Sequence, residues 1–156
     1  MKKKWLLFAY VLVGLLLLVL DRVSKHWAIV QCADGWEINS FLSCDLTYNR
    51  GISWSLFASH DATAFTILCL FISLIIMLVA MHAYFRCNNN RTIWGEVCVI
   101  AGAASNLLDR IVYTGVVDFV HVRAGGYSWP IFNGADVFIV VGVAIIFLTN
   151  YWDDTE

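Results

Sequence analysis

Charged residues are scarce in this chain. Of its 156 residues only 14% are Asp, Glu, Lys or Arg, whereas 60% are hydrophobic, and the mean hydropathy is +0.73. Because soluble domains carry about 25% charged residues, the composition predicts an integral membrane protein. The net charge is −2 and no basic stripe exists beyond the opening MKKK, which argues against a nucleic-acid partner.

Patterns that carry metal or thiol chemistry are also missing. The five cysteines include no CxxC pair, which argues against a thiol oxidoreductase. No two of the four histidines have ligand spacing on one helix with a carboxylate, so we expect neither a metal nor another cofactor. Cys32 and Cys44 fall in one predicted loop, where a structural disulfide is more plausible than a redox site, but the sequence leaves their pairing open.

Apolar segments long enough to cross a bilayer core of about 30 Å recur along the chain. They predict four membrane helices, over residues 5–27, 64–85, 93–109 and 135–152. A cleaved signal peptide is an alternative for the first segment, but that segment runs into DRVSKHW without a small-residue cleavage site, which favours a retained helix. With no repeat, low-complexity tract or linker, we expect a single domain over residues 1–156.

Two long connections, residues 28–63 and 110–134, are predicted on the same side of the membrane. The first alternates apolar and polar residues, which predicts a small β-structured platform on the lipid headgroups. The expected fold class is therefore all-α, with four transmembrane helices and this platform in the first long loop. Both sides carry similar numbers of cations, so the basic start of the first helix decides the orientation, with cytoplasmic termini and extracytoplasmic long loops.

Polar side chains converge at the predicted extracytoplasmic ends of the helices. Asp21 and Lys25 lie at the end of the first helix, Asn106 and Asp109 at the end of the third, and Asp136 at the start of the fourth. A single Asp at the centre of a membrane helix costs about 2.5 to 3.5 kcal/mol on insertion scales. These carboxylates are therefore expected to line a polar cavity or to reach the headgroups.

Two aspartates differ from the others in their neighbours. Asp21 and Asp109 are each followed by arginine, which favours salt-bridged anchors, whereas Asp118 and Asp136 have only apolar neighbours. Two charges about 4 Å apart repel by about 4 kcal/mol at an effective dielectric of 20, so such a pair would share one proton near neutrality. One member then acts as base and the other as acid, as in an aspartic protease. A membrane proton or ion carrier is the alternative, although Glu96 is the one acid placed well inside a span.

Short motifs along the chain carry a family resemblance. They are DRVSK (21–25), NRGISWSLF (49–57), AGAASNLLDR (101–110), VVDF (116–119) and FNGAD (132–136). In this order they resemble the bacterial lipoprotein signal peptidases, or signal peptidase II, over nearly the whole chain. One departure is that Ala101 and Ser105 stand where that family commonly has glycine.

The resemblance implies a membrane aspartic endopeptidase that removes signal peptides from diacylglyceryl-modified prolipoproteins. The cut lies just before the lipidated cysteine, at the extracytoplasmic face of the bacterial inner membrane. The expected enzyme is a monomer in membrane lipid. The resemblance places the catalytic pair on Asp118 and Asp136. The supporting or substrate-binding positions that it implies are Asp21, Lys25, Asn49, Gly51, Asn106, Asp109, Arg110 and Asn133.

Overall fold

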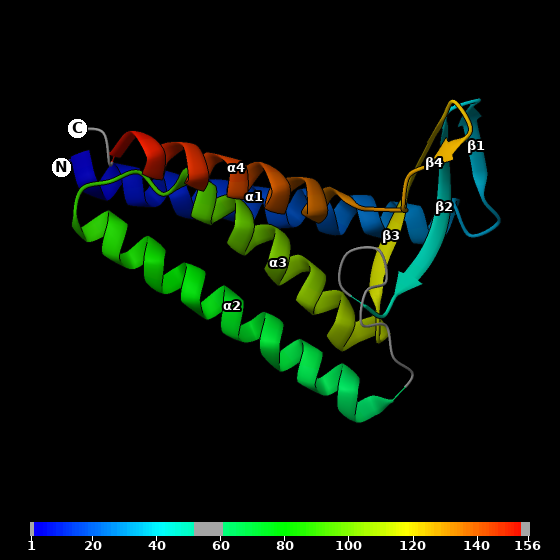
Figure 1. The fold of residues 1–156 in the computed structure, drawn as a ribbon, viewed down its shortest axis with the longest axis horizontal. Helices are drawn as coiled ribbons and strands as arrows, with labels where there is room; N and C mark the ends of the chain where they lie inside the picture. Colours follow the sequence, from blue (N-terminus) through cyan, green and yellow to red (C-terminus); the bar gives the residue numbers. More distant parts are fainter. Residues whose placement is uncertain (1, 52–60, 154–156) are drawn as a thin grey trace.

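The computed structural model describes residues 2–51 and 61–153. Its helices are α1 (Lys2–Gln31), α2 (Ala62–Asn88), α3 (Trp94–Tyr113) and α4 (Gly134–Asp153), and its strands are β1 (Trp36–Asn39), β2 (Leu42–Asn49), β3 (Val116–Ala124) and β4 (Tyr127–Ser128). The helices run along the long axis, the sheet stands across one end of them, and both chain termini lie at the other end (Figure 1). The chain is therefore divided into a helical part and a sheet that closes one end of it.

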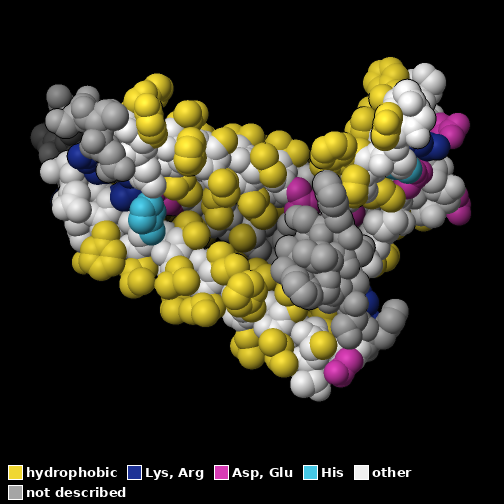
Figure 2. Space-filling view, viewed as in Figure 1, with side chains coloured by type: hydrophobic (Ala, Val, Ile, Leu, Met, Phe, Trp, Pro, Cys, Tyr) yellow, Lys and Arg dark blue, Asp and Glu magenta, His cyan; other side chains and the backbone are white. Residues whose placement is uncertain are grey.

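Among the described residues, three helices are long and apolar enough to cross a membrane. They contain the candidate spans Lys4–Gln31, Ala62–Asn88 and Gly134–Trp152, which agree with three of the four predicted segments. Few of their side chains are buried inside the protein, and hydrophobic side chains cover the helices (Figure 2). This outward apolar surface is what lipid contact requires.

The fourth predicted segment, residues 93–109, forms the helix α3 but is not among the candidate spans in the described part of the chain. α3 packs against α1, α2 and α4, so most of its surface faces protein rather than lipid. Its buried polar residues are Glu96, Ser105, Asn106, Asp109 and Arg110. Because other helices surround it, α3 needs no continuous apolar surface, and its polar content lowers its hydropathy.

Glycines bring α3 and α4 into backbone contact. A Cβ atom on Gly95 would lie 2.7 Å from the carbonyl oxygen of Gly142, and a Cβ on Gly142 would lie 2.6 Å from that of Gly95. Real Cβ atoms do not approach backbone so closely, so only glycine permits this spacing. Small residues commonly allow such close approach between membrane helices.

We expect Gly142→Ala to destabilise the protein by about 1 to 3 kcal/mol, because the added methyl forces α3 and α4 apart. Thermal unfolding in detergent, followed by circular dichroism, measures the effect. Gly14→Ala is the matched control, since its Cβ would meet only Val97 Cγ1 at 3.4 Å, and the same substitution within a helix is normally favourable. Equal midpoints for the two variants would argue against the close helix contact.

The structure confirms the predicted β structure in the first long loop, but the sheet is larger than predicted and the fold is not all-α. It is a four-stranded antiparallel sheet in the order β1-β2-β3-β4, and only β1 and β2 come from the first long loop. The second loop supplies β3 and β4, so Asp118 lies on a strand rather than in an irregular connection. The segment VVDFVHV is rich in β-branched residues, which favour strands. Residues 52–60, the rest of the predicted platform, lie outside the described residues.

Helix ends also differ slightly from prediction. α1 continues to Gln31 and α3 to Tyr113, so the long connections are shorter than residues 28–63 and 110–134.

A disulfide joins Cys32, just beyond α1, to Cys44 of β2, with Cα atoms 5.7 Å apart. This pairing, which the sequence left open, links the end of a helix to the sheet.

Candidate active site

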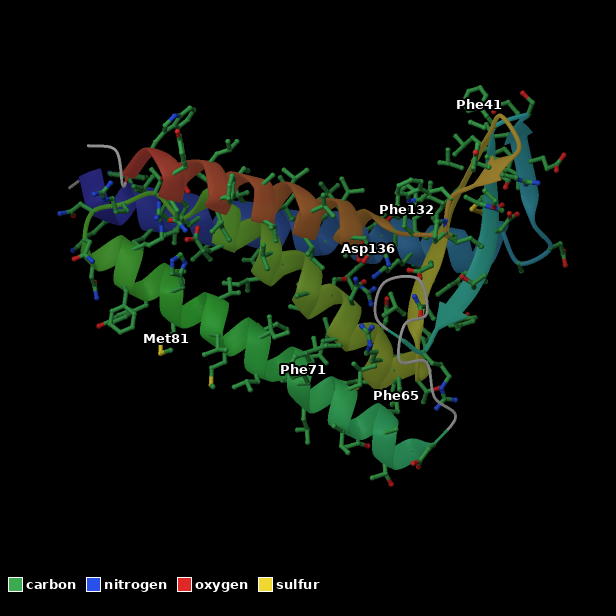
Figure 3. The ribbon with its side chains drawn as sticks, in the orientation of Figure 1. Phe41, Phe65, Phe71, Met81, Phe132 and Asp136 are labelled. Carbon is green, nitrogen blue, oxygen red and sulfur yellow. A yellow bond between two sulfur atoms is a disulfide. The ribbon has the colours of Figure 1, made fainter. Side chains whose placement is uncertain are left out.

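Asp136 lies in the first turn of α4, at the end that meets the sheet (Figure 3). Its backbone N–H donates to Asn133 Oδ1 at 3.1 Å, and its carboxylate Oδ2 accepts from the N–H of Asn133 at 3.3 Å. This reciprocal pair of hydrogen bonds resembles a capping box and satisfies backbone N–H groups at the start of α4. Asp21 of α1 adds a further cap, because its Oδ1 accepts from the N–H of Ala135 at 2.7 Å.

Asp118 on β3 is 3% exposed and faces two amide side chains. Asn133 Nδ2 donates to its Oδ1 at 2.6 Å, and Asn49 Nδ2 donates to its Oδ2 at 3.1 Å. Asn133 therefore contacts both Asp118, through its side chain, and Asp136, through its backbone and its side-chain oxygen. One residue thus fixes the relative placement of the two carboxylates.

Burial raises the pKa of Asp118 to about 7, and the negative charge of Asp136 adds to the rise. The hydrogen bonds from Asn49 and Asn133 and the charge of Lys25 act in the opposite direction but do not cancel the effect of burial. A carboxyl group with this pKa exchanges its proton near neutral pH.

Lys25 is the centre of a buried charge network behind Asp136. Its ammonium group is 2.8 Å from Asp21 Oδ2 and 2.7 Å from Asp109 Oδ2, and it donates to Asn106 Oδ1 at 2.7 Å. Since that bond uses the oxygen of Asn106, the amide nitrogen points the other way and donates to Asp136 Oδ1 at 2.8 Å. The network therefore orients a donor toward one of the two carboxylates.

The arginines bind differently from what their sequence neighbours suggest. Arg22 Nη2 lies 3.7 Å from Asp21 but 2.5 Å from Asp109 on another helix, so the expected salt-bridged anchors are formed largely across helices. Arg110 donates to the carbonyl oxygens of Asn106, at 3.1 Å, and Gly51. It thereby ties α3 to the end of the segment that carries Asn49.

Ser105 makes a contact that the sequence did not predict. Its hydroxyl donates to Asp21 Oδ2 at 2.6 Å and is fully buried. The only signal in the sequence was that a serine stands at a position where the lipoprotein signal peptidases commonly have glycine. Ser105 thus adds a neutral donor to the carboxylate that caps α4.

A cavity of about 280 Å³ opens beside the two carboxylates. Its polar wall contains Asn49, Asn106, Arg110, Asp118 and Asp136, and its apolar wall contains Ile72, Ala103, Val116, Pro130, Ile131, Phe132, Ile139 and Val140. Acidic side chains are visible where the helices meet the sheet (Figure 2). Two carboxylates facing one cavity have the arrangement needed to activate a water molecule against an amide.

All ten of the expected site residues lie within the described residues, and contacts join them into one network. The polar groups of α1, α3 and α4 converge at one end of the bundle, as the sequence predicted, and β2 and β3 bring Asn49 and Asp118 to it. Of the motif at 49–57, residues 52–57 lie outside the described residues. Within residues 2–51 and 61–153, no cluster of three His, Cys, Asp or Glu is placed to hold a metal ion.

Known proteins similar to this chain include members of one peptidase family. The family model described as signal peptidase (SPase) II matches residues 13–152. The lipoprotein signal peptidase of Anaplasma marginale is 35% identical, over 82% of this chain and 75% of its own. That of Rhodopseudomonas palustris is 36% identical, over 87% of each chain. A bacterial membrane enzyme solved by the in meso method at 2.3 Å resolution shares the fold, with a TM-score of 0.73 and 23% identity over 94% of this chain and 89% of its own. The chain therefore belongs to the signal peptidase II family of aspartic peptidases.

Proposed function

We propose that this enzyme removes the signal peptide from diacylglyceryl-modified prolipoproteins, with Asp118 and Asp136 as its catalytic pair. The observation that carries the proposal is the placement of the two carboxylates, held by Asn133 and facing one cavity. The relatives that bear the name lipoprotein signal peptidase support the substrate class. The remaining polar residues act by holding this pair and lining the cavity.

In the proposed reaction Asp118 holds a proton and Asp136 is ionised. The raised pKa of Asp118 supports its role as the acid, while the amide N–H of Asn106 supports the charge on Asp136. Asp136 takes a proton from water as the water oxygen attacks the scissile carbonyl carbon, and Asp118 gives its proton to the carbonyl oxygen. When the C–N bond breaks, the departing amine takes up a proton from Asp136, and the hydroxyl proton of the collapsing intermediate returns to Asp118.

The disulfide supports the proposed orientation in the membrane. Disulfides persist in oxidising compartments outside the cytoplasm, and Cys32 and Cys44 lie at the sheet end of the protein. This supports an extracytoplasmic active site, with both termini at the cytoplasmic end, in the bacterial inner membrane. Because α3 packs along three candidate spans and leads from the α2 connection to the sheet, we propose that it crosses the membrane as the fourth span.

The direct test of this function is cleavage by the purified protein in lipid nanodiscs. We expect it to cut a lipobox peptide that carries a diacylglyceryl cysteine, immediately before that cysteine, as read by product masses. The same peptide without the lipid is the control and should be cut much more slowly. Equal cleavage of both peptides would rule out recognition of the lipid.

The carrier hypothesis is not favoured by the contacts of Glu96. Oε1 of this buried carboxylate lies 3.2 Å from Arg86 Nε and 3.1 Å from His82 Nδ1. Glu96 is therefore held in an ion pair at the end of the helices that lies opposite the sheet. Arg86 also donates to Asn150 and to the carbonyl oxygen of Thr92, which links α2 to α4 and to the start of α3. These contacts serve to hold the helices together.

We expect kcat/KM to fall as the pH rises above about 7. The pKa of Asp118 is raised to about 7, so above this pH Asp118 loses the proton that it donates. Asn49 donates to the charged carboxylate and lowers this pKa, so Asn49→Ala should move the alkaline limb to higher pH. Initial rates at subsaturating substrate measure both. Asn39→Ala, at the end of β1 in the β1–β2 hairpin, is the control. If the alkaline limb of the pH profile stays at the same pH in Asn49→Ala, the assignment of that limb to Asp118 is contradicted.

Chelators are expected to leave cleavage unchanged, because the two carboxylates perform both proton transfers. Initial rates with and without excess EDTA, after dialysis, measure this. A loss of activity that added zinc restores would overturn the metal-free mechanism.

A further inference from the structure

The proposed catalytic pair is divided between two parts of the fold. Asp118 lies on β3 of the sheet, whereas Asp136 lies on α4 of the helical part. The hydrogen bonds of Asn133 connect Asp118 to Asp136 only while the sheet stays packed against the ends of the helices. The alignment of the carboxylates therefore depends on whatever fixes the sheet to the helices.

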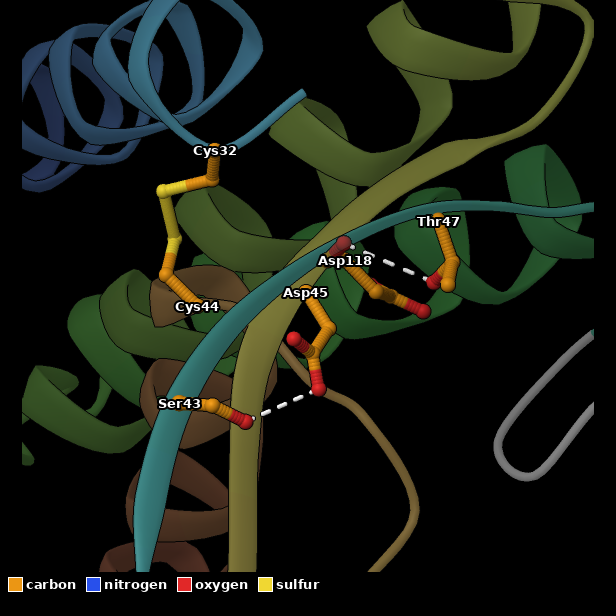
Figure 4. Close-up of a disulfide and its surroundings, with 6 residues drawn as sticks. All are labelled: Cys32, Ser43, Cys44, Asp45, Thr47 and Asp118. Atoms are coloured by element: carbon orange, nitrogen blue, oxygen red, sulfur yellow. Dashed lines mark hydrogen bonds between the residues drawn. A yellow bond between two sulfur atoms is a disulfide. The ribbon is translucent and has the colours of Figure 1, made fainter. Parts of the chain in front are cut away.

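Cys32 and Cys44 make a covalent tie between these parts (Figure 4). Cys32 directly follows α1, the helix that carries Lys25, and Cys44 lies in β2, which pairs with β3. The two cysteines are 0% and 3% exposed. The bond is thus part of the packed junction rather than a surface link.

Packing connects this bond to Asp118. Cys44 is in register with Val120 of β3, and Phe119, the residue after Asp118, shares one buried cluster with both cysteines. Further along β2, Thr47 is in register with Asp118 and donates to its carbonyl oxygen at 3.5 Å (Figure 4). A shift of β2 relative to α1 would therefore displace the strand that carries the carboxylate.

We propose that the Cys32–Cys44 disulfide is a positioning element for Asp118 in peptide cleavage, an inference that rests on the proposed function. Without the bond, the sheet shifts on α1 and Asp118 leaves its alignment with Asp136, whereas the apolar side chains that α2, α3 and α4 contribute to the cavity wall still bind substrate. The bond forms when the two thiols give up two protons and two electrons to a disulfide-bearing oxidant, which becomes a dithiol. Full activity therefore follows thiol oxidation outside the cytoplasm.

The first test is the double variant Cys32→Ala/Cys44→Ala, assayed in nanodiscs with the lipidated lipobox peptide. We expect kcat to fall at least about tenfold, since misplacement by about 1 Å costs up to a hundredfold, while KM changes by less than about twofold. Cys69→Ala/Cys98→Ala is the matched control, because these are free cysteines on α2 and α3, and it should keep the wild-type kcat. A kcat within about twofold of wild type in the folded Cys32→Ala/Cys44→Ala protein overturns the proposal.

A second test changes the redox state and not the sequence. The chain is synthesised without cells into nanodiscs, in reduced or in oxidised glutathione, and thiol alkylation with mass measurement reports whether the bond is present. We expect the reduced product to show the low kcat and to recover on oxidation, while Cys32→Ala/Cys44→Ala responds to neither condition. Equal kcat in the reduced and oxidised wild-type products overturns the proposal.

Phe119→Leu tests the same path with the disulfide intact, and it decides the question if the double cysteine variant does not fold. The smaller side chain loosens β3 against the disulfide, so we expect a lower kcat with an unchanged KM. A wild-type kcat in Phe119→Leu overturns the proposal. If the wild-type chain itself does not cleave the lipidated peptide, the proposed function fails; if wild type and these variants all cleave alike, only the positioning role fails.

Discussion

Asp118→Asn and Asp136→Asn will each lower kcat for lipobox cleavage by about 10³-fold or more, because each substitution removes one of the two groups that transfer protons. Asparagine keeps the size of the side chain and one acceptor oxygen. It therefore preserves a bond from Asn133 or Asn49 at position 118 and one from Asn106 at position 136. Both variants should accordingly fold, and KM should change little.

The measurement is single-substrate kinetics in nanodiscs, with thermal unfolding run in parallel to verify folding. Asp34→Asn is the matched control, since Asp34 is an exposed carboxylate outside the cavity. It should retain the wild-type rate. If either active-site variant cleaves at a near wild-type rate while Asp34→Asn behaves as expected, the proposed pair is wrong.

Lys25→Met will destabilise the protein by about 3 to 5 kcal/mol, the usual cost of removing one partner from a buried ion pair. Methionine fills a similar volume but leaves Asp21 and Asp109 without the ammonium group that lies 2.8 and 2.7 Å from them. It also frees Asn106 Oδ1, so the amide that donates to Asp136 loses its orientation. Both stability and kcat should therefore fall.

Thermal unfolding measures the loss of stability, and Lys4→Met, at an exposed position near the start of α1, is the control. Adding Asp21→Asn to Lys25→Met should restore part of the stability, because Arg22 then balances the remaining charge of Asp109 at 2.5 Å. That recovery separates a charge effect from a packing effect. An unfolding midpoint for Lys25→Met equal to that of Lys4→Met would show that the network contributes little.

The membrane helices were predictable because lipid contact imposes a local requirement. A helix that faces lipid needs a run of apolar residues, and such a run is visible in any window of the sequence. The predictions for α1, α2 and α4 are confirmed within a few residues for this reason. α3 was recognised as a helix, but its low hydropathy becomes understandable only once the helices around it are seen.

The sheet could be predicted only in part, because strand pairing is decided by residues far apart. The alternating first loop indicated β structure, and β1 and β2 form there. The apolar run around Asp118 did not reveal that it pairs with β2, in a register that places Asp118 opposite Thr47. The sequence therefore indicated an unusual carboxylate at position 118 without its strand or its neighbours.

The sequence by itself determined the membrane class, the family resemblance and the end of the helices at which polar residues gather. These depend on local composition, on short motifs, and on the alternation of helix direction across a membrane. The tertiary structure decided which side chains touch: Lys25 with Asn106, Ser105 with Asp21, Cys32 with Cys44, and Asn133 with both proposed catalytic carboxylates. The physical reason is that a hydrogen bond needs its two partners about 3 Å apart, so partners as many as 114 residues apart, such as Asp21 and Ala135, are fixed only when the helices and strands have packed.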